Sequence, residues 1–450
     1  IVIRMMVLLF SPSGAKQRRY KLLLGIVVLL GVVMVAKNAR ANGEEFKALF
    51  EYGERGSYFG NTREDISIPK SSVGQASTNS GFDSYHRESG VVQLFFPRGA
   101  PESVRTKFPL VYLCTPIHGF TFRRWTEIMQ PSLINFLTSH GYAVVVPSSI
   151  GERGSSNEVL GAIMPNLDSQ ANGVSLEEVA KRYLNFTVAS FTYLTNEFFG
   201  SESKKKNDNN NNYVPGESAL DTVRRNYRTR VYTLYSRVDV ENAALIGFSV
   251  GGAIAAYSGS ILKSRNQMNL RMSFLLAPTI GERPGAARKV GLELWNLYHS
   301  DLHNNPNVIV TGSADGMGGL SSSRAFYFEA EKLEALLVEI RFATHCHFPV
   351  VMSECNLLNI QEDIGGVRAF DLALANAAFR YYLRGDQKAG ELISLQRGVD
   401  SFKSPTSVWD VDVLTFRNDT RGFIKLFNNN RGPTFERSSK VKFREMNDRG

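Results

Sequence analysis

A serine flanked by glycines stands out among the residues whose types and spacing could do chemistry. Ser249 is the centre of Gly-Phe-Ser-Val-Gly, residues 247–251, a match to G-x-S-x-G. In that motif the serine occupies a tight turn between a buried strand and a helix, where bulky neighbours would collide. Free N–H groups at the start of the following helix can stabilise an oxyanion. The non-catalytic alternative is a glycine-rich turn whose serine takes no part in chemistry.

The flanking residues supply the context that the motif requires. Residues 243–248 are apolar, which is typical of a buried parallel strand. Residues 250–257 are mostly small and alanine-rich, which is typical of a buried helix. This context favours a nucleophile, and it predicts an acid and a histidine further along the chain.

Candidates for both groups follow two later apolar runs. Asp315 comes directly after residues 307–312, and an aspartate in that place faces the crevice where α/β sheets bind ligands. A turn closed by the aspartate side chain is the structural alternative. The next expected strand delivers His345 and His347 to the same edge. In the hydrolase arrangement Ser249 would attack a carbonyl, a histidine would take its proton, and Asp315 would orient that histidine.

Apolar runs and amphipathic stretches alternate along the middle of the chain, which predicts an α/β fold with a mostly parallel sheet. The expected strands are residues 91–97, 108–114, 142–147, 243–248, 272–278, 307–312 and 336–342, and the expected helices are 125–140, 175–200 and 366–383. Gly141 would end the first of these helices as a C-terminal cap.

Four of these segments resemble the α/β-hydrolase superfamily, and the resemblance covers roughly residues 90–390. They are the strand and loop at 108–121, the turn at 243–257, the acid segment at 307–316 and the histidine segment at 344–348. Within the superfamily the chain is most similar to chlorophyllase-like, dienelactone-hydrolase-like and polyester-hydrolase-like esterases. The resemblance implies the α/β-hydrolase fold, with helices on both faces of the sheet. It also implies a serine esterase that acts through an acyl-enzyme and needs no cofactor.

The resemblance assigns roles residue by residue. Ser249 matches the nucleophile and Asp315 matches the acid. His345 matches the base, because it begins a His-Cys-x-Phe segment. His347 remains an alternative, since the His-Phe-Pro that it begins also resembles the histidine segment of polyester hydrolases. Two other functions stay open: a non-catalytic binding protein on this fold, and an acyltransferase or peptidase that uses the same triad.

The surroundings of the serine give further expectations. The resemblance implies that the backbone N–H groups of Phe120 and Val250 form the oxyanion hole. An apolar pocket that suits hydrophobic acyl or alkoxy groups would be lined by Phe120, Phe122, Trp125 and Phe248. The alternative is that these aromatics are core residues, and it applies most to Phe122 and Trp125. Plant chlorophyllases carry histidine and arginine where this chain has Phe248 and Val250, and they place an acid where residues 277–282 have no aspartate. These departures argue against chlorophyll as the substrate.

The charge of the chain is concentrated at its N-terminus. The net charge is +9, but residues 1–41 hold seven of the 52 Lys and Arg and no acidic residue. The rest is nearly neutral, so nucleic acid is not an expected partner. A basic region, the apolar run 22–36 and Ala39-Arg40-Ala41 form the pattern of a secretory signal peptide. This predicts a secreted or endomembrane enzyme with a small-molecule or lipid-like ester substrate, bound to a membrane only if 22–36 stays on as an anchor.

The remaining stretches complete the expected organisation. After the leader, residues 42–90 are an irregular extension with room for one strand, and 91–395 form the catalytic domain. A low-complexity insertion interrupts that domain at 201–217, and residues 396–450 are an appendage of unknown order.

The cysteines, and the histidines outside the proposed triad, predict neither a disulfide scaffold nor a metal site. Cys114, Cys346 and Cys355 are too few for a disulfide scaffold, and spacing does not establish whether the last two pair. His299 and His303 share a helix face and have Asp301 between them in the sequence, but no further metal ligand is apparent nearby. We therefore expect a solvated helix face and no metal.

Overall fold

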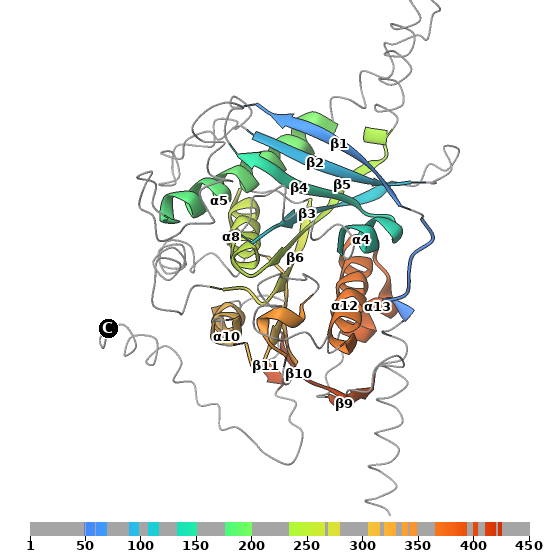
Figure 1. Cartoon of the computed structure of the whole chain (residues 1–450), viewed down its shortest axis with the longest axis vertical. Helices are drawn as coiled ribbons and strands as arrows, with labels where there is room; N and C mark the ends of the chain where they lie inside the picture. Colours follow the sequence, from blue (N-terminus) through green and yellow to red (C-terminus); the bar gives the residue numbers. More distant parts are fainter. Residues whose placement is uncertain are drawn as a thin grey trace, which may run out of the picture. The chain divides into compact units, whose positions relative to one another are not determined.

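The fold is described from a computed structural model of the chain (Figure 1). The structure describes residues 49, 51–58, 60–69, 90–98, 107–116, 133–150, 176–199, 234–265, 269–279, 305–315, 319–329, 335–340, 343–348, 365–393, 399–403, 410–419 and 422–424. The chain divides into two compact units, 1–49 and 50–450, and every element below belongs to the second. Across the described ranges, no helix combines the length and the apolar character needed to cross a membrane.

One sheet forms the centre of the second unit, and over the described residues it has eleven strands. They are β1 (Asn61–Ile68), β2 (Gly90–Pro97), β3 (Phe108–Cys114), β4 (Ala143–Ile150), β5 (Val238–Phe248), β6 (Leu270–Leu276), β7 (Asn307–Gly312), β8 (Ala335–Ile340), β9 (Val399–Lys403), β10 (Asp410–Asp419) and β11 (Gly422–Ile424). Their order is β1-β2-β4-β3-β5-β6-β7-β8-β10-β11, with β9 also on β10. Neighbours from β4 to β8 are parallel, and the strands beyond them at both edges are antiparallel. The protein is therefore an α/β protein with a mostly parallel sheet.

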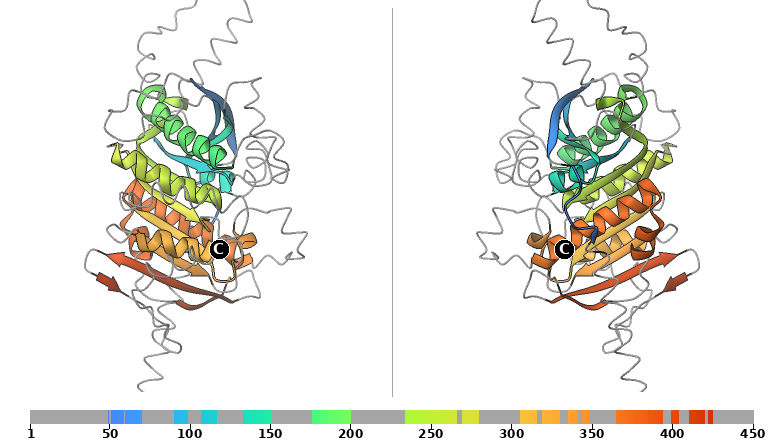
Figure 2. Two further views of the ribbon diagram at one scale, coloured as in Figure 1. Left: turned by 90° about the vertical axis from the view of Figure 1, so that its left-hand side faces the viewer. Right: turned by 90° about the vertical axis from the view of Figure 1, so that its right-hand side faces the viewer.

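Helices cover both faces of this sheet (Figure 1, Figure 2). The helices are α4 (Asn135–Ser139), α5 (Leu176–Thr192), continued by the π-helical η4 (Tyr193–Phe198), α8 (Val250–Ser264), α10 (Gly319–Glu329), α12 (Gly365–Arg384) and α13 (Gln387–Ile393). On β6, the Phe274 ring contacts that of Phe379 on α12, whereas its neighbour Leu275 packs in the cluster that contains Ile254 of α8. Because consecutive strand residues point to opposite faces, α8 and α12 lie on opposite sides of the sheet.

The parallel centre follows from the sequence pattern. β3, β7 and β8 are buried along their whole length, as strands covered on both faces must be. The seven strands expected from apolar runs overlap β2 to β8, and α12 overlaps the helix expected over 366–383. The helix expected over 125–140 is described from residue 133 onward, where α4 itself has five residues. Gly141, with a φ of 79°, follows it in the conformation expected of a C-terminal cap.

Both edges of the sheet are formed by strands from outside the expected catalytic domain of residues 91–395. The extension at 42–90 contributes β1, which pairs along its full length with β2 and buries Ile66 and Ile68. The segment expected to be an appendage contributes β10, which pairs with β8 from Val413 opposite Ile340 to Asn418 opposite Ala335. Backbone pairing, and not a long apolar run, defines these edge strands, so their sequences carry only a weak strand pattern.

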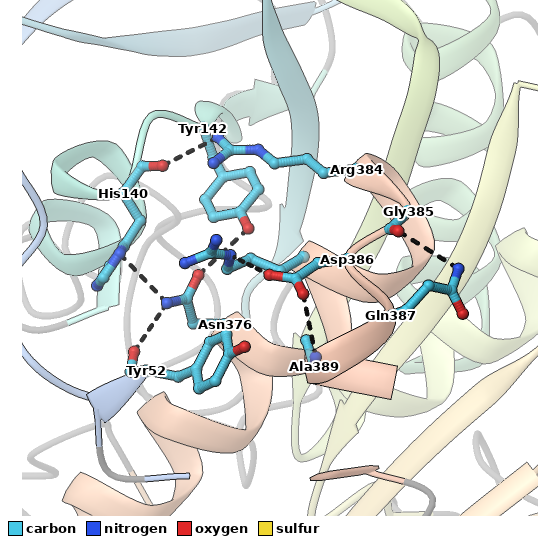
Figure 3. Close-up of polar contacts among 10 residues, drawn as sticks. Tyr52, His140, Tyr142, Asn376, Arg384, Gly385, Asp386, Gln387 and Ala389 are labelled. Atoms are coloured by element: carbon cyan, nitrogen blue, oxygen red, sulfur yellow. Dashed lines mark hydrogen bonds and ion pairs between the residues drawn. The ribbon is translucent and has the colours of Figure 1, made fainter. Parts of the chain in front are cut away.

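A group of hydrogen bonds, which we call the clasp, ties the segment before β1 to α12 (Figure 3). The clasp consists of Tyr52, His140, Tyr142, Asn376 and Arg384. Asn376 Nδ2 donates to the Tyr52 carbonyl at 2.7 Å and to His140 Nδ1 at 3.2 Å. Tyr142 donates its hydroxyl hydrogen to Asn376 Oδ1 at 3.2 Å. Arg384 donates to the His140 carbonyl at 2.9 Å, and its guanidinium lies 4.5 Å from the centre of the Tyr142 ring.

The clasp requires an uncharged His140. Its Nδ1 accepts a hydrogen bond from Asn376, so the ring proton lies on Nε2, which donates to the Glu54 carbonyl at 2.7 Å. Burial lowers the pKa of His140 to about 4; the bond to Glu54 opposes this change, and the charges of Arg384 and Arg380 add to it. The imidazole is therefore neutral over most of the pH range in which a folded protein works.

Several expectations fall outside the described residues. These are the leader at 1–41, the insertion at 201–217, the His299 and His303 pair, and the side chains of Cys346 and Cys355. Cys114 is described, and it is a buried free thiol.

Candidate active site

Three strands bring the predicted triad to one edge of the sheet. Ser249 follows β5, Asp315 follows β7 by three residues, and His345 follows β8 by five. These strands run parallel through β6, so their carboxyl ends share an edge. That edge is where α/β sheets bind ligands, because the connections leave a crevice there.

The backbone at Ser249 is held in a strained turn. Its φ of 58° and ψ of −127° lie in a region that side-chain-bearing residues adopt rarely, at a cost of about 1–3 kcal/mol. The chain closes tightly around the turn: a Cβ at Gly247 would collide with the Gly251 carbonyl, and one at Gly251 would collide with the Cys114 carbonyl. The two glycines of the motif are thus required by close backbone approach.

A continuous line of hydrogen bonds joins the three side chains. His345 Nε2 lies 2.9 Å from Ser249 Oγ, and His345 Nδ1 lies 2.8 Å from Asp315 Oδ2. The side chains of His345 and Asp315 are 3% and 0% exposed. A carboxylate can only accept, so the ring proton lies on Nδ1 and Nε2 is left to accept the serine hydroxyl hydrogen. This is the tautomer that a general base for Ser249 needs.

Asp315 and His345 are placed by contacts between their own loops. The N–H of Ser313 donates to the Ile340 carbonyl at 2.9 Å, and the N–H of Ala314 donates to the Ala343 carbonyl at 3.0 Å. The loops after β7 and β8 therefore continue the pairing of the strands for a few residues. The N–H of Asp315 donates to the Gly312 carbonyl at 3.2 Å, so the backbone closes the turn and leaves the carboxylate to His345.

The neighbouring histidine has a different position. The short 3₁₀ helix η6 (His345–His347) is capped by Thr344, whose backbone N–H donates to His347 Nδ1 at 2.7 Å. The Thr344 hydroxyl also lies 3.0 Å from the same nitrogen. His347 is 6% exposed and serves as the reciprocal cap of this turn. Of the two candidates, His345 is the one whose ring nitrogens lie within hydrogen-bond distance of Ser249 and Asp315.

A turn after β6 supports the serine from the side, and the sequence had given no indication of it. The N–H of Ser249 donates to the Leu276 carbonyl at 2.9 Å, and the N–H of Thr279 donates to the Ser249 carbonyl at 3.2 Å. Between them, Ala277 has a φ of 42°. Ser249 and Ala277 are the non-glycine residues with positive φ among those described, and the two residues that bond to the Ser249 backbone, Leu276 and Thr279, lie on either side of Ala277 in the chain.

Of the two expected oxyanion donors, the structure describes Val250 but not Phe120. Val250 is the first residue of α8, and the leading N–H groups of a helix have no acceptor within it. Its N–H therefore remains available next to Ser249. Phe120 lies outside the described residues. Cys114, behind the turn, is no rival nucleophile, because burial raises the pKa of its thiol.

Phe248 does not lie where the sequence placed it. It was expected in the pocket wall, but it is 0% exposed, and its ring lies 4.9 Å from that of His345, centroid to centroid. On its other side it approaches Phe348, at 6.4 Å between centroids. Phe248 and Ile246 point to the same face of β5, because alternate strand residues share a face.

Taken together, the edge offers a serine with a positioned base, an acid behind the base and a helix N–H beside the oxygen. These groups are suited to nucleophilic attack on a carbonyl. Among the described residues no group of histidines, cysteines and acids could hold a metal ion. The chain matches no protein-family model and no curated protein sequence.

Proposed function

We propose that this protein is a serine hydrolase with an α/β-hydrolase fold that cleaves carboxylic esters. The observation that carries the proposal is the hydrogen-bonded line from Ser249 through His345 to Asp315, with Ser249 in a strained turn between β5 and α8. The serine, acid and histidine follow each other along the chain in the order that α/β hydrolases use. The mostly parallel sheet supports the same assignment.

The chemistry follows from the positions of the protons. As Ser249 Oγ bonds to the carbonyl carbon, its proton passes to His345 Nε2, and Asp315 stabilises the imidazolium through Nδ1–H. The N–H of Val250 donates to the oxyanion of the tetrahedral intermediate. His345 then returns the proton to the departing alkoxide, which leaves as the alcohol, and an acyl-serine remains. Water repeats the sequence with His345 as base, and it releases the carboxylic acid.

The proposed substrates are small or lipid-like esters with a hydrophobic group. This proposal rests on the sequence expectation for Phe120, Phe122 and Trp125, because Phe248 is 0% exposed. No cofactor enters the proposed reaction.

Labelling with a fluorophosphonate tests the proposal directly, since these probes react with activated serines. We expect the label on Ser249 in the wild-type protein and none in Ser249→Ala. We also expect Ser249→Ala to lose hydrolysis of p-nitrophenyl butyrate while its circular dichroism spectrum and unfolding midpoint stay unchanged. Hydrolysis that survives in a correctly folded Ser249→Ala protein would defeat the assignment. Absence of labelling in a folded wild-type protein would favour a non-catalytic binding protein on the same fold.

A further inference from the structure

The base of the proposed triad is in contact with an aromatic ring as well as with its two polar partners. The planes of the Phe248 and His345 rings are 34° apart, with 4.9 Å between centroids, so the phenyl ring presents mainly its face. Phe248 is fully buried, and Phe348 backs it and is also 0% exposed. The imidazole is thus bounded by Ser249 at Nε2, Asp315 at Nδ1 and the phenyl face at its side.

This contact changes in strength during the proposed reaction. The face of a phenyl ring carries negative potential, so it attracts a cation more than it attracts a neutral ring. When His345 takes the proton of Ser249, a neutral imidazole becomes an imidazolium in a site that water barely reaches. An interaction that is stronger in the transition state than in the ground state raises kcat.

We propose that Phe248 is a positioning residue that holds the His345 imidazole between Ser249 and Asp315 and stabilises the imidazolium during each proton transfer. The inference rests on the proposed function. The inference gives Phe248, which precedes the proposed nucleophile, a role toward the proposed base His345. Its residue type alone suggested contact with the substrate.

Stepwise fluorination of the Phe248 ring separates this role from simple packing. Phenylalanine with one, two or three ring fluorines keeps nearly the same shape, while the negative potential of its face declines with each fluorine. We expect log kcat for p-nitrophenyl butyrate to fall at each step, with KM unchanged because the ring is buried. Loss of the whole contact, as in Phe248→Leu, should lower kcat by about 2- to 30-fold.

Phe274 provides the matched control. It is also 0% exposed, and its ring lies 6.0 Å from that of Phe379 on α12, centroid to centroid, with the two planes tilted by 60°. The same fluorine series at Phe274 should leave kcat unchanged. An equal decline at both positions, or a flat series at Phe248, would show that Phe248 serves as packing only.

Two further outcomes identify which idea fails. A change confined to KM would return Phe248 to the substrate pocket and overturn the inference alone. A wild-type protein that neither turns over the ester nor takes the fluorophosphonate would overturn the proposed function, and the inference with it.

Discussion

Acidification should weaken the clasp through a single group, His140. The folded-state pKa of about 4 lies below the ordinary value of 6.5, so His140 contributes stability that is present above pH 6.5 and lost as the pH falls toward 4. A second ring proton on Nδ1 would face the Asn376 amide N–H group that now donates to it. The new charge would also be repelled by Arg384 and Arg380.

The magnitude follows from the difference between the two pKa values. That difference corresponds to ~3.4 kcal/mol of unfolding free energy in all, of which ~2.8 kcal/mol would be lost between pH 7 and pH 4. Because His140 is only half-buried, solvent screening reduces the effect, and we expect ~1.5 kcal/mol between pH 7.5 and pH 4.5. Folding stabilities of this kind total about 5–15 kcal/mol, so such a loss is measurable.

Urea unfolding of the wild type and of His140→Gln at both pH values isolates the contribution. Glutamine can still donate a hydrogen bond toward the Glu54 carbonyl, but it carries no charge at any pH. Surface carboxylates titrate equally in both proteins, so they cancel in the difference. We expect the stability advantage of the wild type over the variant to shrink by ~1.5 kcal/mol at pH 4.5. An advantage that stays constant with pH would refute the reasoning.

Three further predictions concern the site and the sheet edge. Asp315→Asn should lower kcat by ~10⁴-fold in ester hydrolysis, because an amide favours the wrong tautomer of His345; activity near that of the wild type would exclude Asp315 as the acid. His345→Ala should damage turnover more than His347→Ala, which should mainly lower the unfolding midpoint through the lost cap; the reverse ranking would move the base to His347. Glu339→Gln should cost ~2 kcal/mol in urea unfolding with activity retained, because Glu339 is 2% exposed and pairs with Arg324 through two bonds of 2.6 and 2.8 Å; unchanged stability would show that the pair contributes nothing.

The centre of the fold and the line of the triad could be predicted from the sequence. Parallel strands covered on both faces need unbroken apolar runs, such as residues 243–248 and 307–312, and those runs are visible without a structure. The direction of such strands fixes one edge for the residues that follow them. Ser249, Asp315 and His345 are therefore brought together by topology, before any side-chain detail is known.

The choice between the two histidines could not be made from spacing. His345 and His347 follow the same strand, and the difference between them is one short turn. Thr344 caps that turn by donating its N–H to His347 Nδ1 at 2.7 Å. That bond occupies one ring nitrogen of His347 and leaves His345 to face Ser249. Local cap geometry places the two histidines differently, and a sequence pattern does not contain that geometry.

The edge strand β10 was equally hard to predict from the sequence, for a different reason. β10 alternates apolar and polar residues over part of its length, but what defines it is backbone pairing with β8. A partner more than 70 residues away in the chain leaves no trace in a local window, and β-propensity reflects such context more than intrinsic preference.

The strain at Ser249 shows why the turn after β6 belongs to the site. A residue at φ 58° persists only if the surrounding structure holds it there. The constraints come from both sides: Leu276 accepts the N–H of Ser249, and Thr279 donates to its carbonyl. Between these two partners the chain turns at Ala277, which itself has a φ of 42°. The backbone of Ser249 is thus held from the segment after β6 as well as by its own strand β5, so the position of the proposed nucleophile depends on both strands.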